Sequence, residues 1–118
     1  ALVKGEKRCV ISVLSARVGS IEDNRLGGWY SYRASKAALN MLVKTAAIEY
    51  ERRAKNVRFL LFHPGTVDTN LSKPFQSKSS TKLMQPSEVA MSLIKLMDRS
   101  DTGSNIEFID WEGKKINW

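Results

Sequence analysis

Apolar residues occur along the chain in two patterns that alternate. Three short runs, 9–14, 57–63 and 106–111, are apolar and rich in β-branched or aromatic residues, as is typical of strands covered on both faces. Two longer segments between the runs repeat apolar residues at the period of a helix. The order strand, helix, strand, loop, helix, strand predicts a parallel α/β sheet with right-handed crossovers.

The longest periodic segment runs from Tyr30 to Ala54 and predicts a helix. Its apolar stripe has i, i+3, i+4, i+7 spacing and consists of Leu39, Leu42, Val43, Ala46, Ala47 and Tyr50. Further small or apolar residues widen the stripe, namely Ala34, Ala37, Ala38, Met41 and Ile48. A helix that is apolar over so much of its girth is buried on more than one side. We therefore expect one side to cover the sheet and the other to form a homodimer.

The second helix is expected over residues 86–99, with Pro86 suited to the first helical position and Glu88 to the positive N-terminal end. Before it, residues 67–85 are rich in Ser, Lys, Thr and Pro. A loop of this length inside a compact domain is typical of a lid or binding segment.

Composition narrows the class of protein. A chain of 118 residues with 42% hydrophobic and 26% charged residues fits one small globular domain, and no apolar run reaches the roughly 20 residues of a membrane span. One cysteine suits a reducing compartment, so we expect a cytoplasmic location. One histidine and one cysteine are too few for a zinc site. The net charge of +7 is spread along the chain, so we expect no nucleic-acid partner.

Tyr32 and Lys36 are the candidate catalytic pair. They lie four residues apart on the first predicted helix and therefore share a face. A lysine ammonium close to a phenol favours the phenolate, so the pair can exchange a proton with a carbonyl or alcohol oxygen near neutral pH. The setting supports this interpretation, because a strand and a Ser/Gly loop come directly before the helix.

These segments together resemble the short-chain dehydrogenase/reductase family. The similarity lies in Ser15–Ser20, Tyr32–Leu39 and His63–Thr69, and it covers nearly the whole chain in the family's order. Residues 23–30 and 108–113 resemble the C-factor-related branch of that family. The resemblance implies the C-terminal part of a Rossmann-type doubly wound parallel sheet, with about three strands and two main helices. It also implies a small-molecule carbonyl or alcohol substrate.

The resemblance assigns roles to single residues. Tyr32 would be the general acid/base, and Lys36 would assist it and bind the nicotinamide ribose. The nicotinamide end of NAD or NADP would be held by Tyr32, Lys36, Pro64, Gly65, Val67 and Thr69. Residues 70–84 would close over the substrate. The family also pairs the tyrosine-bearing helix between subunits, in line with the expected homodimer.

Two features depart from the family. The catalytic serine normally stands three residues before the loop glycine, where this chain has Ala16, which leaves Ser15 and Ser20 as the neighbouring hydroxyls. We count Ser15 as the third candidate catalytic residue. The Gly-rich turn that cradles the pyrophosphate is absent. We therefore expect residues 1–118 to be a single partial domain without the dinucleotide-binding half, and to be inactive alone.

A second function class stays open beside the oxidoreductase. Ala16 and the missing nucleotide half also fit a non-enzymatic signalling or interaction protein of the C-factor type. The sequence names neither the substrate nor the direction of the reaction. It also leaves the choice between NAD and NADP open.

Overall fold

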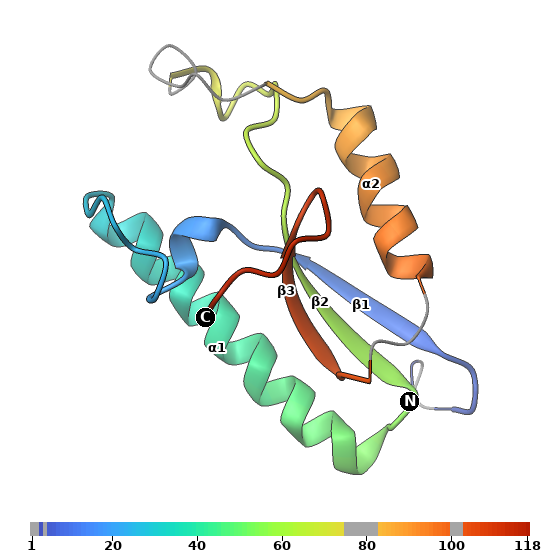
Figure 1. Cartoon of the computed structure of the whole chain (residues 1–118). Coiled ribbons are helices and arrows are strands. Elements are labelled where there is room, and N and C mark those ends of the chain that lie inside the picture. The colour runs from blue at the N-terminus through green and yellow to red at the C-terminus, as the bar shows by residue number, and fades with distance from the viewer. Residues whose placement is uncertain (1–2, 4, 75–82, 100–102) are drawn as a thin grey trace.

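The computed structural model describes residues 3, 5–74, 83–99 and 103–118. Its elements in chain order are β1 (Cys9–Leu14), the 3₁₀ turn η1 (Arg17–Gly19), α1 (Tyr30–Arg53), β2 (Val57–His63), α2 (Pro86–Asp98) and β3 (Ile106–Asp110) (Figure 1). The predicted elements are therefore present, with ends that agree to within one residue. β3 is one residue shorter than predicted because Asp110 begins a turn, in which the Gly113 N–H donates to the Asp110 carbonyl at 2.9 Å.

The three strands form a parallel sheet in the order β1-β2-β3. Val13 pairs with Leu61, and Leu61 pairs with Phe108, so equivalent residues of the three strands stand side by side. Parallel strands end at the same edge of the sheet. The segments that follow β1, β2 and β3 therefore lie together, and these segments carry the candidate site.

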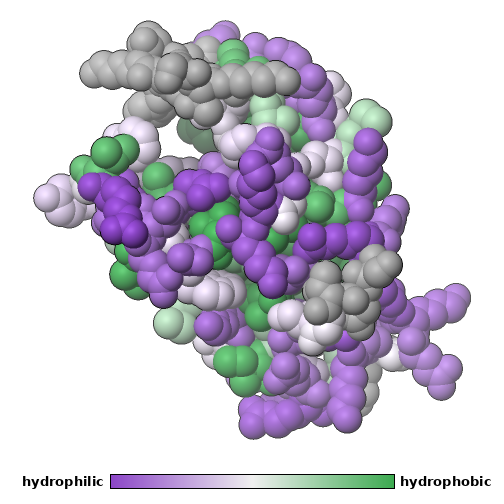
Figure 2. Space-filling view, viewed as in Figure 1, coloured by the Kyte–Doolittle hydropathy of each residue, from purple (hydrophilic) through white to green (hydrophobic). Residues whose placement is uncertain are grey.

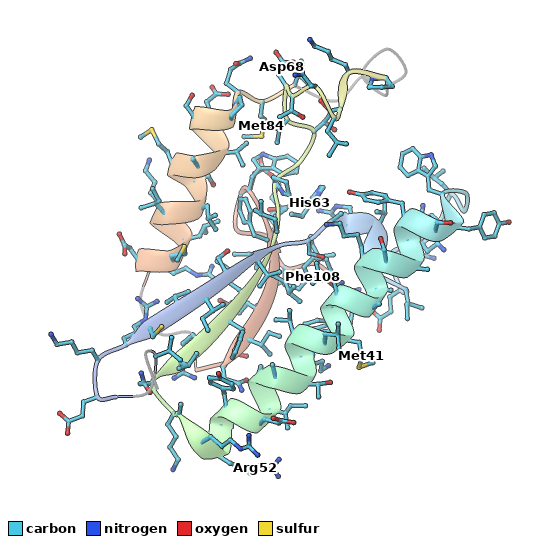
Figure 3. The ribbon with its side chains drawn as sticks, turned by 180° about the vertical axis from the view of Figure 1, so that it is seen from behind. Met41, Arg52, His63, Asp68, Met84 and Phe108 are labelled. Carbon is cyan, nitrogen blue, oxygen red and sulfur yellow. The ribbon has the colours of Figure 1, made fainter. Side chains whose placement is uncertain are left out.

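The two helices cover opposite faces of the sheet (Figures 1 and 3). On one face α1 packs into the main hydrophobic core, which consists of Val43, Ala47, Ala54, Val57, Phe59, Leu61, Phe108 and Ile116. On the other face, Leu96 and Met97 of α2 line a small cavity with Val10 and Leu60. The arrangement confirms the predicted doubly wound α/β architecture.

The handedness of the crossovers corrects one prediction. Both connections step across the sheet in the same direction, from β1 to β2 and from β2 to β3. Connections of equal hand would place both helices on one face. Because α1 and α2 lie on opposite faces, the two connections have opposite hands, and only one is right-handed as expected.

Local sequence signals explain where α2 begins. The C-terminal segment after β3 then folds back over part of the core. Gln85 and Glu88 form a capping box, and Pro86 takes the first turn, as its fixed φ favours. After β3, the Ile116 N–H donates to the Phe108 carbonyl at 2.8 Å, and the C-terminal residues lie beside α1 (Figure 1).

The surface is mostly hydrophilic. Figure 2 shows polar side chains spread over this face, with apolar side chains visible in patches between them. In the described part of the chain, neither helix combines the length and hydropathy that crossing a bilayer requires.

Candidate active site

Tyr32 and Lys36 lie in the first turns of α1 and face each other along one side of the helix. The Lys36 Nζ lies 5.9 Å from the centroid of the Tyr32 ring and donates to the Leu14 carbonyl at 3.3 Å. The Tyr32 side chain is 49% exposed, so its phenol is open to a substrate. The structure therefore brings the two candidate catalytic residues together at the end of β1.

Close packing of η1 fixes the start of α1. A Cβ added to Gly19 would lie 2.9 Å from the carbonyl carbon and the Cβ of Lys36, so only glycine fits at this approach. The Arg33 guanidinium donates to the carbonyls of Gly28 at 3.0 Å, Gly27 at 3.1 Å and Val18 at 3.4 Å. These contacts hold the loop and η1 against the helix turn that carries the catalytic pair.

Ser15, the third candidate catalytic residue, lies just after β1 and points its hydroxyl at α1. It is buried, and its hydroxyl donates to the Oδ1 of Asn40 at 2.5 Å. Ser20 is also buried, and its hydroxyl donates to the Trp118 carbonyl at 3.2 Å. Ala16 occupies the family's serine position and is buried. The Ser15 hydroxyl is thus engaged within the protein, and its role as a donor to the substrate stays a prediction.

Asn40 is a buried polar residue beside the candidate pair that the sequence analysis did not single out. It lies on the same helix face as Tyr32 and Lys36, at i+4 from Lys36, and is 4% exposed. The spacing Tyr32, Lys36, Asn40 was visible in the sequence, since a polar residue on an apolar helix face signals a buried partner. The Ser15–Asn40 hydrogen bond ties the end of β1 to the catalytic helix.

The turn after β2 carries the other predicted site residues. Pro64 and Gly65 follow His63 directly, and Gly65 has a φ of 74°, which glycine adopts without strain. A Cβ added to Gly65 would lie 2.9 Å from Cε3 of Trp111, so the Trp111 ring rests directly on this turn. The Ser15 N–H donates to the Phe62 carbonyl at 2.9 Å, which places the end of β1 beside this turn.

The remaining residues of the predicted nicotinamide site lie at the base of the following loop. Val67 forms a parallel bridge with Met84, so the two ends of the loop meet. Thr69 is exposed, and its N–H donates to the Ser72 hydroxyl at 3.2 Å. The predicted lid over residues 70–84 falls partly outside the described residues, since 75–82 are not among them. Figure 3 places Asp68 and Met84 at the base of this loop and His63 at the end of β2.

His63 is held in its neutral form. Burial lowers its pKa, the nearby Arg17 charge lowers it further, and Asp110 raises it, with a net pKa of about 4. Its ring packs edge to face against Trp111, with centroids 5.6 Å apart. A buried, neutral imidazole that packs against an aromatic ring fits a structural role in this turn.

Arg17 and Asp110 form an ion pair that the sequence did not reveal. The Nη2 of Arg17 lies 3.0 Å from Oδ2 of Asp110, and its Nη1 lies 3.2 Å from Oδ2 of Asp23. The two partners lie 93 positions apart in the chain, so no local pattern could have linked them. The pair connects η1 to the end of β3.

Comparison with known proteins gives the same assignment as the fold. A profile of the family described as short chain dehydrogenase matches residues 3–80. The 1-hydroxy-2-glutathionyl-2-methyl-3-butene dehydrogenase of Rhodococcus sp. (strain AD45) is 36% identical over 108 residues, 92% of this chain and 46% of the relative. The C-signal of Myxococcus xanthus is 33% identical over 117 residues, 99% of this chain and 65% of the relative.

The structural comparison adds the fold. The NADPH-bound carbonyl reductase from chicken fatty liver superimposes with a TM-score of 0.72 at 30% identity, over 92% of this chain and 42% of that protein. The sheet and its two helices therefore correspond to part of a Rossmann-type fold. This chain belongs to the short-chain dehydrogenase family. It spans about half the length of the curated relatives that it matches.

Proposed function

We propose that this chain carries the catalytic end of an NAD(P)-dependent oxidoreductase that acts on a small carbonyl or alcohol substrate. The observation that carries the proposal is the Tyr32–Lys36 pair at the edge where the strands end. The Lys36 Nζ lies 5.9 Å from the centroid of the Tyr32 ring. The 36% identical dehydrogenase and the NADPH-bound carbonyl reductase support this reaction class.

The donor groups of the site fit a nicotinamide cofactor. Lys36 uses one ammonium proton on the Leu14 carbonyl, and an ammonium has three, so donors are left for ribose hydroxyls. Gly65 keeps its backbone in a tight turn with a φ of 74° at the edge where β2 ends, beneath the Trp111 ring. We propose that Pro64, Gly65, Val67 and Thr69 border the nicotinamide ring. The cofactor, when bound, supplies or takes the hydride.

The protein's own part is proton transfer. In the reductive direction, the Tyr32 phenol donates its proton to the substrate oxygen as negative charge develops there. The Lys36 ammonium stabilises the phenolate that remains. We propose that Tyr32 and Lys36 perform this step without a Ser15 hydroxyl, because that group is used on Asn40.

The test is carbonyl reduction by a protein that contains this chain, followed as loss of NADPH absorbance. Tyr32→Phe removes the transferable proton and should lower kcat by about 100-fold or more. Tyr30→Phe is the matched control, because Tyr30 is 87% exposed and lies two positions away on the same helix. Equal rates for Tyr32→Phe and the unsubstituted protein would overturn the proposal. The chain alone lacks a Gly-rich phosphate turn, so we expect it to be inactive by itself.

A second candidate function is a non-enzymatic signalling or interaction protein. It is supported by the 33% identity to C-signal over 99% of the chain and by Ala16 at the serine position. In that case Tyr32→Phe would leave the biological function intact. The same variant therefore separates the two candidates.

We also propose that α1 mediates homodimerisation. Its outer face exposes Met41 at 64%, Leu42 at 69% and Ile48 at 51%, beyond the apolar surface already buried against the sheet. Sedimentation should show a dimer that Leu42→Arg converts to a monomer. Leu71→Arg, at an exposed leucine outside α1, should leave the dimer intact. A monomer for the unsubstituted protein would exclude the proposal.

A further inference from the structure

We propose that Arg17 is a positioning residue that couples the catalytic helix to the Pro64-Gly65 turn through Asp110. The inference rests on the proposed function, since it concerns how the two parts of the same site keep their relative places. Three contacts carry it: α1 with η1, η1 with Asp110 at the end of β3, and Trp111 after β3 with the Pro64-Gly65 turn.

The first step joins Arg17 to the catalytic helix. Arg17 begins η1, and Gly19 ends it. Gly19 packs so closely on Lys36 that a Cβ would lie 2.9 Å from the Lys36 carbonyl carbon. Arg33 of α1 also donates to the Val18 carbonyl inside η1 at 3.4 Å. Because of these contacts, η1 and the helix turn that holds Tyr32 and Lys36 should move together.

The second step joins Arg17 to the turn after β3. Its Nη2 lies 3.0 Å from Oδ2 of Asp110, whose side chain is 3% exposed. A carboxylate that is buried to this extent needs its cationic partner, because removing one partner leaves an unpaired charge. The other carboxylate oxygen, Oδ1, accepts the N–H groups of Glu112 and Lys114, each at 3.0 Å. Asp110 thus fixes both η1 and the turn that contains Trp111.

The third step joins Trp111 to the Pro-Gly turn. The Trp111 ring fills the space where Gly65 would carry a Cβ and packs against His63 at 5.6 Å. The Ser92 hydroxyl of α2 donates to the Trp111 carbonyl and holds the turn from the other side. Arg17 is therefore linked to the Pro64-Gly65 turn through Asp110 and Trp111, in addition to the hydrogen bond between the Ser15 N–H and the Phe62 carbonyl.

The single histidine of the chain reports on this link. His63 faces Arg17 and Asp110; its pKa is lowered first by burial and then by the Arg17 charge. Arg17→Met should raise the pKa of His63 above about 4, with burial, the largest cause, still keeping it below 6.5, as measured by NMR titration of the imidazole. It should also shift the Gly65 amide and Trp111 indole signals. Arg53→Met is the matched control, since Arg53 pairs with Glu49 on exposed α1 and loses the same charge.

The outcomes separate the coupling from a merely stabilising role. The proposal would be overturned if Arg17→Met changed the NMR signals of η1 alone and left those of Gly65 and Trp111 unchanged. If Arg17→Met fails to fold, Arg17→Lys replaces it, because it keeps the charge and removes the guanidinium geometry. It should move Gly65 and Trp111 while leaving the pKa of His63 near its original value.

A kinetic readout links the coupling to the reaction. In an active protein that contains this chain, Arg17→Met should raise the KM for NADPH about fivefold or more, and Arg53→Met should leave it unchanged. The NMR experiment needs neither cofactor nor turnover. Failure of the coupling would therefore be seen even if the oxidoreductase proposal holds, and Tyr32→Phe would test that proposal independently.

Discussion

The site has two sides that are held together by different means. The side that carries the candidate pair Tyr32 and Lys36 is called the catalytic side here. On it, Gly19 packs against the backbone of Lys36, and polar groups at the end of β1 bond to α1. On the turn side, Gly65 packs against the side chain of Trp111, which also covers His63. The contact between Gly19 and the Lys36 backbone leaves no room to adjust, whereas the Trp111 ring at Gly65 can shift. The catalytic side should therefore tolerate change less well than the turn side.

The largest effect that we expect comes from pH and involves the turn side. His63 is neutral in the folded protein, with a pKa of about 4 that is set mainly by burial, against 6.5 when unfolded. The unfolded chain thus binds more protons between these values. The free energy of unfolding should fall by about 3 kcal/mol as the pH drops from 6.5 to 4, and stay level above 6.5.

Urea denaturation at a series of pH values measures this dependence. His63→Gln removes the titrating group and should flatten most of the change between pH 6.5 and 5, where few carboxyl groups titrate. An unaltered slope in that variant would show that His63 is not buried in its neutral form.

The next effect concerns the catalytic side. Gly19→Ala should lower the free energy of unfolding by about 2–3 kcal/mol, because the new Cβ would meet the Lys36 backbone at 2.9 Å. Gly5→Ala is the control, as an added Cβ there has nothing within 4 Å. Thermal and urea unfolding of both variants decide the point. A loss no larger at Gly19 than at Gly5 would contradict the close contact between η1 and α1.

Gly65→Ala should cost about 2 kcal/mol, chiefly from its φ of 74°. Gly103→Ala carries the same backbone strain at a φ of 78° with open space for the Cβ, and so isolates the strain alone. Any extra loss of stability in Gly65→Ala, relative to Gly103→Ala, comes from the contact of the new Cβ with the Trp111 ring. Adding Trp111→Leu to Gly65→Ala should recover that extra loss. If the double variant shows no such coupling energy, the ring does not rest on the turn.

The smallest effect is expected at the buried hydrogen bond. Ser15→Ala should lower the free energy of unfolding by about 1–2 kcal/mol, because the Asn40 amide would lose its partner in a buried place. Thr45→Ala removes a hydroxyl from the exposed side of the same helix, where it bonds to the Met41 carbonyl at 2.9 Å, and should cost less than half as much. Equal losses for the two variants would exclude a special role for the Ser15–Asn40 pair.

Most of the fold was predictable because its signals are local. The strands and helices were predicted from hydrophobic periodicity and, for the second helix, from Pro86 at its start, and their ends agree with the structure to within one residue. The Tyr32–Lys36 pair was predictable for the same reason, since i, i+4 spacing on a helix fixes the shared face. The opposite hands of the two crossovers were not predictable, because no local pattern reports them.

The part of the site that the sequence could not predict depends on long-range contacts. Asp110 meets Arg17 from 93 positions away, and Trp111 meets Gly65 from the end of another strand. Ser15 was ambiguous because a serine at a strand end can face the site or the helix behind it. Its direction is decided by Asn40, which supplies a buried acceptor.

The most direct test of the account uses the two halves of the cofactor separately. We propose that the nicotinamide end of the cofactor binds to this chain, whose sequence contains no Gly-rich phosphate turn. NMR titration of the chain with reduced nicotinamide mononucleotide should shift the signals of Tyr32, Lys36, Gly65 and Thr69, and titration with AMP should leave them unmoved. Shifts with AMP alone, or nicotinamide shifts confined to residues away from this edge, would contradict the central claim.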